Sequence, residues 1–126
     1  MATLIRVMVI DDNEADQFLA KTLIEDFNPD IEIIQATDGQ EALDLLNKIE
    51  NKPDVILLDI NMPVMDGHEF LEHYEKTDHK MAVFIMLASS DQEIDIERAS
   101  IYGFVKRYFT KPIDNENLLE IQNTYL

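Results

Sequence analysis

Acidic residues stand directly after two apolar runs of this chain. Asp11 and Asp12 follow the run at residues 4–10, and Asp59 follows the run at residues 55–58. A single acid in such a place is typical of a helix cap. Three carboxylates held close together repel one another unless a cation lies among them, and their oxygens with water suit Mg²⁺ or Mn²⁺. The three acids together therefore predict a metal site.

A short hydroxyl cluster and a lysine follow two further apolar runs. Ala88, Ser89 and Ser90 come after residues 81–87, and Lys111 comes shortly after residues 108–109. In an open parallel sheet, ligands bind outside the carboxyl ends of the strands. Four strands would then bring three carboxylates, hydroxyl groups and one ammonium group to a single edge. We expect the ammonium group to counter the charge of the carboxylates.

Five apolar runs alternate with five segments of helical periodicity. The runs cover residues 4–10, 31–36, 55–58, 81–87 and 108–109, and the longer ones are nearly continuous. Such runs are typical of strands that are covered on both faces, as in a parallel sheet. The helical patterns start near Ala15, Ala42, Phe70, Ile94 and Leu118. This order predicts an α/β fold in which helices cover both faces of a five-stranded parallel sheet.

Three of the helices have recognisable start signals. Asp38 is followed by Glu41 at the third helical position, which predicts an N-cap. Ser90 with Glu93 is typical of a capping box, and Asp114 is expected to cap the last helix.

Composition excludes several classes of function. The chain has 10 basic residues against 26 acidic ones, a net charge of −16, so we expect neither nucleic acid nor membrane as a direct partner. It has no cysteine, which excludes disulfides, thiolate zinc sites and cysteine nucleophiles. Its 126 residues predict one domain over residues 1–126. The lack of a membrane-length apolar run or a signal peptide predicts a cytoplasmic protein.

Three stretches, at residues 9–12, 57–67 and 108–112, occur in an order and at separations that are characteristic of one family. A weaker stretch at residues 36–43 also fits. From about Ile5 to its C-terminus, the chain resembles the receiver domains of two-component response regulators. The resemblance implies the flavodoxin-like (βα)5 fold, a doubly wound sheet with strand order 2-1-3-4-5.

By this resemblance, Asp59 accepts a phosphoryl group from a sensor histidine kinase or a phosphotransfer protein. Asp12 and Asp59 would bind Mg²⁺ directly, Asp11 would act largely through water, and the backbone carbonyl of Asn61 would complete the set. Lys111 would contact a phosphoryl oxygen, and the bond to the proline after it is cis in relatives. A carboxylate is a poor nucleophile, so such transfer relies on positioning and charge neutralisation.

The usual switch residues of the family are matched only in part. Relatives have Thr or Ser directly after the fourth strand, where the register of the following helix places Ala88. Counting from Asp59 or back from Lys111 points to Ser89 instead. The aromatic switch residue is matched by Tyr108. If Ala88 holds the position, we expect weak coupling of Asp59 to Tyr108, or coupling through Ser89.

The resemblance implies a switch and not a multiple-turnover enzyme, with at most slow self-dephosphorylation tuned at positions 61 and 90. Phosphatases of the haloacid dehalogenase type need a second aspartate where this chain has Asn61. A pseudo-receiver, an interaction module with weak or no phosphorylation-coupled switching, remains an alternative because of Ala88.

The histidines and a group of aromatic residues are weaker candidates. His68, His73 and His79 lack the spacing of a helical metal pair and are expected at the surface. We expect one of two roles for Ile101, Tyr102, Phe104 and Tyr108. They form a docking patch for an unidentified downstream protein, or some of them belong to the core.

Overall fold

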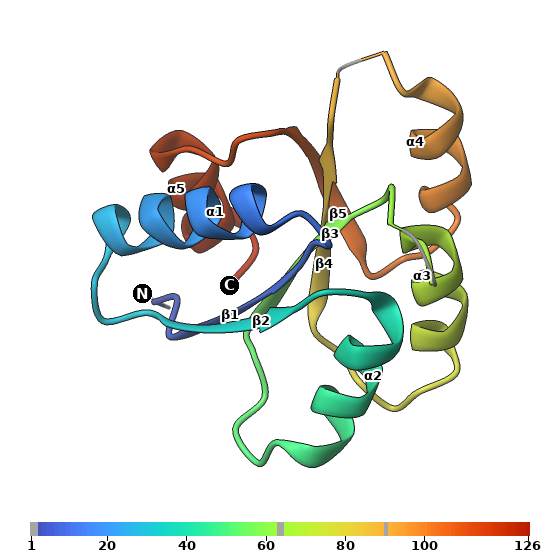
Figure 1. Cartoon of the computed structure of the whole chain (residues 1–126), viewed down its shortest axis with the longest axis horizontal. Coiled ribbons are helices and arrows are strands. Elements are labelled where there is room, and N and C mark those ends of the chain that lie inside the picture. The colour runs from blue at the N-terminus through green and yellow to red at the C-terminus, as the bar shows by residue number, and fades with distance from the viewer. Residues whose placement is uncertain (1–2, 63–64, 90) are drawn as a thin grey trace.

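The computed structural model describes residues 3–62, 65–89 and 91–126, in which strands and helices alternate. The elements are β1 (Arg6–Ile10), α1 (Glu14–Phe27), β2 (Glu32–Ala36), α2 (Gly39–Lys48), β3 (Val55–Asp59), α3 (Gly67–Glu75), β4 (Ala82–Leu87), α4 (Glu93–Ala99), β5 (Val105–Thr110) and α5 (Asn115–Thr124). The five strands are parallel, in the order β2-β1-β3-β4-β5 (Figure 1). The predicted doubly wound sheet of order 2-1-3-4-5 is confirmed.

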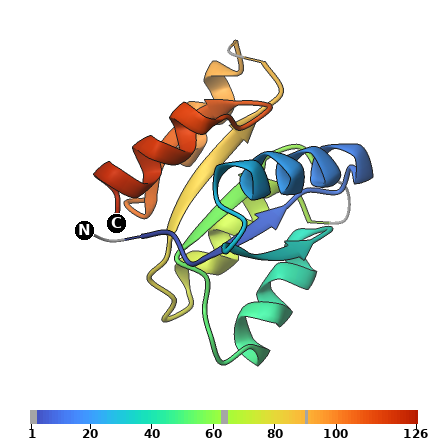
Figure 2. The ribbon, with the colours of Figure 1, turned by 90° about the vertical axis from the view of Figure 1, so that its left-hand side faces the viewer.

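Helices cover both faces of the sheet, α1 and α5 on one face and α2, α3 and α4 on the other (Figures 1 and 2). Successive strand residues point to opposite faces. In β1, Val7 and Val9 therefore join the core under α1 and α5, whereas Met8 and Ile10 join the core on the opposite face. The continuous apolar runs of the sequence follow from this double burial.

The last strand is longer than the apolar run at residues 108–109 predicted, because exposed polar residues and a β-bulge interrupt its apolar pattern. Val105 pairs with Val83, but Arg107 pairs with the next residue, Phe84, so Lys106 is an extra residue on β5. Polar residues and bulges are common on edge strands, and both obscure the apolar pattern of a strand.

Short polar side chains cap most of the helices. Asp38 and Asp114 accept hydrogen bonds from backbone N–H groups of α2 and α5, as predicted. Asn13 and Asp66 cap α1 and α3 in the same way. Ser90, the predicted cap of α4, lies outside the described residues, and Gln92 stands at the N-cap position of that helix.

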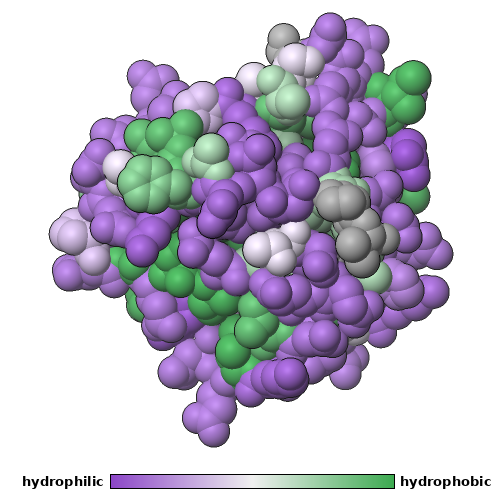
Figure 3. Space-filling model, in the orientation of Figure 1, coloured by the Kyte–Doolittle hydropathy of each residue, from purple (hydrophilic) through white to green (hydrophobic). Residues whose placement is uncertain are grey.

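Hydrophilic residues cover most of the face that Figure 3 shows, and apolar residues appear there in separate patches. The most exposed large apolar side chains of the described residues include Phe18 on α1, Ile94 on α4 and Ile101 after α4. Within the described ranges, the helices are too short or too polar to cross a membrane.

Candidate functional site

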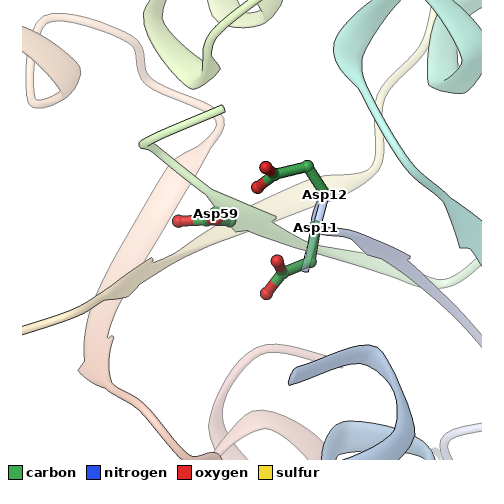
Figure 4. A group of neighbouring side chains, drawn as sticks. All are labelled: Asp11, Asp12 and Asp59. Atoms are coloured by element: carbon green, nitrogen blue, oxygen red, sulfur yellow. The ribbon is translucent and has the colours of Figure 1, made fainter. Parts of the chain in front are cut away.

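Three acidic side chains meet at the carboxyl ends of β1 and β3. Asp59 is the last residue of β3, and Asp11 and Asp12 directly follow β1. One carboxylate oxygen from each lies within 4.8 Å of the others, and Figure 4 shows the three side chains at this edge. Asp11 and Asp59 are each 5% exposed, whereas Asp12 is exposed. The structure thus brings together the three acids that the sequence singled out.

Backbone groups fix one oxygen of each buried carboxylate. The Asp11 Oδ1 atom accepts a hydrogen bond from the N–H of Asn13 at 2.9 Å, and Asp59 Oδ1 accepts one from the N–H of Asn61 at 3.2 Å. Asn61 itself is exposed. The Oδ2 atoms of both carboxylates lie near the ammonium group of Lys111.

Lys111 places its ammonium group among three carboxylates. The Nζ atom lies 2.9 Å from Asp11 Oδ2, 2.9 Å from Asp16 Oδ2 and 3.4 Å from Asp59 Oδ2. The Lys111 backbone N–H donates to the carbonyl of Leu87 at 2.8 Å, which ties this residue to the end of β4. The peptide bond between Lys111 and Pro112 is cis, as the resemblance implied.

Asp59 and Lys111 shift each other's proton affinity in opposite ways. Burial raises the pKa of Asp59 to about 6, which outweighs the lowering by Lys111, while the charge of Asp11 adds to the rise. Burial alone would lower the pKa of Lys111, but hydrogen bonds to Asp11 and Asp16 and the charge of Asp59 raise it above its ordinary value. At neutral pH the site therefore holds a charged lysine beside a carboxylate whose ionisation is costly.

A cavity of about 270 Å³ opens beside the acids, between α1, the sheet and the loop after β5. Asp11, Asp16, Asp59 and Lys111 line it together with apolar side chains of α1 and the strands. The low-polarity walls explain why Asp59 is desolvated although it lies at the end of its strand.

The loop after β4 begins with Ala88, because Leu87 is the last residue of the strand. Leu87 pairs with Thr110, the residue before Lys111. Every second residue of β4 lies on the same face of the sheet, so position 88 follows Phe84 and Met86 on one face. Asp59 lies on that face too.

The two residues of this loop already have hydrogen-bond partners. The side-chain oxygen of Gln92 accepts bonds from the backbone N–H groups of Ala88 at 2.8 Å and Ser89 at 3.2 Å. The Ser89 hydroxyl bonds to Asp91. Tyr108 is half-buried on the α4 side of the sheet, and its hydroxyl donates to the carbonyl of Ile96 at 3.3 Å.

The prediction for His68 was wrong. His68 is 8% exposed in the first turn of α3, where Nε2 lies 2.8 Å from Asp95 Oδ1 of α4. Hydrogen bonding to His68, the largest influence, lowers the pKa of Asp95. Its burial depends on how α4 packs against α3, which the sequence does not show. His73 is exposed as expected, and His79 is partly buried beside Tyr74.

The docking patch suggested by the sequence divides between surface and core. Ile101 is 75% exposed, whereas Tyr102, Phe104 and Tyr108 are partly buried against the core on the α2, α3 and α4 side.

Sequence reasoning missed Asp16 and Gln92. Asp16 stands in the first turn of the helix that starts just after Asp12, so its position near the strand ends was accessible from the pattern. That its carboxylate reaches Lys111, 95 residues away, depends on how α1 lies beside the loop after β5.

The model of one protein family, the response regulator receiver domain, matches residues 7–123. The chain belongs to this family. It is 32% identical over 122 residues to sporulation initiation phosphotransferase F of Bacillus subtilis, across 96% of this chain and 93% of that protein. A crystal structure of a two component response regulator from Cytophaga hutchinsonii aligns with a TM-score of 0.86 and 28% identity, covering 96% of each chain.

Some relatives of this receiver domain are much longer. A protein-glutamate methylesterase/protein-glutamine glutaminase of Methanospirillum hungatei is 33% identical over 119 residues, which are 94% of this chain. The chain spans only 34% of that relative's length.

The acidic cluster of the receiver fits a hard divalent cation. Asp11, Asp12 and Asp59 offer carboxylate oxygens at mutual separations that one ion can span. Such donors, completed by water, are the ligands of Mg²⁺ and Mn²⁺ and not of softer metals.

Proposed function

We propose that this receiver is the phosphoacceptor of a two-component phosphorelay, in which Asp59 takes a phosphoryl group from a sensor histidine kinase or a phosphotransfer protein. One observation carries the proposal: Asp11, Asp12 and Asp59 converge within 4.8 Å at the edge where Lys111 also arrives. A structural role alone gives no reason to concentrate three acids, two of them buried, at one edge of the sheet beside a single lysine.

The transfer step requires only positioning and charge. A carboxylate oxygen of Asp59 attacks phosphorus as the bond from phosphorus to the imidazole nitrogen of phosphohistidine breaks, and the electron pair returns to that nitrogen. Lys111 donates hydrogen bonds to the phosphoryl oxygens. Backbone N–H groups keep the Asp11 and Asp59 carboxylates in place throughout.

Mg²⁺, or Mn²⁺ in its place, would be held by Asp11, Asp12, Asp59 and the backbone carbonyl of Asn61. When bound, it offsets the negative charge that accumulates between Asp59 and the incoming phosphoryl group.

The protein acts as a switch and not as a multiple-turnover enzyme. Its product stays covalently attached to Asp59 until slow self-dephosphorylation releases phosphate. The phosphorylated form would present a changed α4–β5–α5 surface, which includes the exposed Ile94 and Ile101, to a downstream protein.

A second reading, an interaction module with weak switching, is favoured by the loop after β4. Ala88 has no hydroxyl, the Ser89 hydroxyl is bonded to Asp91, and Gln92 holds both backbone N–H groups. In this interpretation Asp59 still accepts a phosphoryl group, but its phosphorylation is only weakly coupled to Tyr108.

The test is incubation with acetyl phosphate and Mg²⁺, followed by intact-mass spectrometry. We expect the mass to rise by one phosphoryl group, with peptide mapping placing it on Asp59. Asp59→Asn should abolish the modification, and EDTA should suppress it. Asp26→Asn, which removes an exposed carboxylate from α1, is the matched control and should be modified like the wild type. A wild-type protein that stays unmodified would overturn the proposal.

A further inference from the structure

Asp16 contacts the lysine of the acceptor site without belonging to the acidic cluster. Its Oδ2 atom lies 2.9 Å from Lys111 Nζ, closer than the 3.4 Å of Asp59 Oδ2. Asp16 stands at the third position of α1, where its backbone N–H donates to the capping side chain of Asn13 at 2.9 Å. Its carboxylate is thus held by a rigid helix terminus and lines the same cavity as Asp59.

The ammonium group of Lys111 has three hydrogens, and in this structure three carboxylates surround it. A phosphoryl group on Asp59 needs at least one of these hydrogens. A divalent cation among Asp11, Asp12 and Asp59 would have to share the carboxylate groups of Asp11 and Asp59 with Lys111. Both ligands therefore require Lys111 to redistribute its hydrogen bonds. Of the three carboxylates around Lys111, Asp16 is the one that would bind neither the cation nor the phosphoryl group.

We propose that Asp16 is a positioning residue that holds Lys111 on the α1 side of the site, in competition with Asp59 and its phosphoryl group. This inference rests on the proposed phosphoacceptor function. By holding one hydrogen of the ammonium group and keeping the group 3.4 Å from Asp59, Asp16 leaves the carboxylate of Asp59 more available to the cation. By the same contact it limits the hydrogen bonding of Lys111 to a phosphoryl oxygen.

The proposal predicts opposite effects of one substitution on two ligands. In Asp16→Asn, Lys111 turns fully to Asp11 and Asp59, so Mg²⁺ binding should weaken by about fivefold, the scale of one ordinary intramolecular hydrogen bond. At saturating Mg²⁺, the rate of Asp59 phosphorylation by acetyl phosphate should instead rise by about fivefold. A merely structural defect would impair both.

Two controls separate the contact from general charge effects. Glu14→Gln removes the same charge from the same first turn of α1, but the ion pairs of Lys111 within the described residues are those with Asp11, Asp16 and Asp59. Because Glu14 is exposed, its loss should change either quantity by less than about twofold. In a Lys111→Met background, Asp16→Asn should no longer weaken Mg²⁺ binding beyond what Glu14→Gln does.

The measurements are calorimetric titration with MgCl2 and the time course of intact mass with acetyl phosphate. Opposite shifts in Asp16→Asn that disappear without Lys111 support the proposal. Shifts equal to those of Glu14→Gln, or losses of both binding and rate, overturn it. If the wild type takes no phosphoryl group, the acceptor function fails, and the magnesium titrations still decide whether Asp16 controls Lys111.

Discussion

Asp59 is held in a place where its charge is costly. It is 5% exposed beside an apolar cavity wall, and its attraction to Lys111 does not compensate fully for the loss of water. A nucleophile that is poorly solvated before the reaction loses less solvation on the way to the transition state. The same burial means that ionised Asp59 lowers the free energy of unfolding when no cation is bound.

Replacing Asp59 should therefore stabilise the metal-free protein at neutral pH. The pKa of Asp59 is about 6 in the fold, against the ordinary 3.8 of an aspartate in water, so between these pH values the folded state binds more protons than the unfolded state. The contribution of Asp59 to the free energy of unfolding thus falls as the pH rises through this window. In EDTA, the free energy of unfolding of Asp59→Asn should exceed that of the wild type by roughly 3 kcal/mol at pH 7.5 and match it below about pH 4.

Urea denaturation followed by circular dichroism over this pH range measures the difference. The exposed-site variant Asp26→Asn should show no such pH-dependent gain. Equal stability of Asp59→Asn and the wild type at pH 7.5 would contradict the assignment of a costly buried carboxylate.

At the scale of elements, the start of α3 is packed directly against the strand that carries Asp59. A Cβ atom on Gly67 would lie 2.6 Å from the Ile60 Cα atom and 3.0 Å from the carbonyl oxygen of Asp59. Gly67→Ala should therefore push α3 away from β3 and lower the free energy of unfolding by about 1–3 kcal/mol. Gly103→Ala is the matched control, because a methyl group there would meet nothing within 4 Å. Chemical denaturation of both variants tests this, and equal stabilities would argue against the close contact.

The loop between β4 and α4 is the second element on which function depends. Ala88→Thr would supply a hydroxyl on the face of Asp59, and we expect it to enlarge the phosphorylation-induced shifts of amide NMR signals in α4, β5 and α5. Ser89→Ala should change them little, because that hydroxyl is bonded to Asp91. An unchanged pattern in Ala88→Thr, with a reduced one in Ser89→Ala, would assign the switch position to Ser89.

At the scale of the whole molecule, a net charge of −16 opposes folding through self-repulsion. The three clustered acids concentrate part of this repulsion at one edge. A cation bound there should stabilise the fold, by about 2.7 kcal/mol when free Mg²⁺ reaches a hundred times its Kd.

Thermal denaturation with MgCl2, compared with NaCl of equal ionic strength, isolates this effect. NaCl should raise Tm modestly by screening, and MgCl2 should raise it further. Asp12→Asn should lose the additional rise while keeping the response to NaCl. Identical curves in the two salts would exclude a specific site.

Much of this arrangement could be predicted from the sequence because it depends on local pattern. Doubly buried strands leave continuous apolar runs, and the residues that follow them, Asp11, Asp59 and Lys111, must lie at one edge. The reach of Asp16 and the burial of His68 depend on how helices pack side by side, which no periodicity records. The start of β5 was missed because an edge strand tolerates polar residues and its bulge breaks the alternation.

That bulge has a consequence for any graft of β5 from one receiver into another. Val105 and Tyr108 pack on the same side of the sheet, although three positions apart, because Lys106 is skipped in the pairing. A transplanted strand of equal length but without the bulge would turn each side chain after the bulge position to the opposite face of the sheet. Lys111 would then turn toward α4, and the grafted receiver would lose its ammonium group from the acceptor pocket while keeping every residue of the motif.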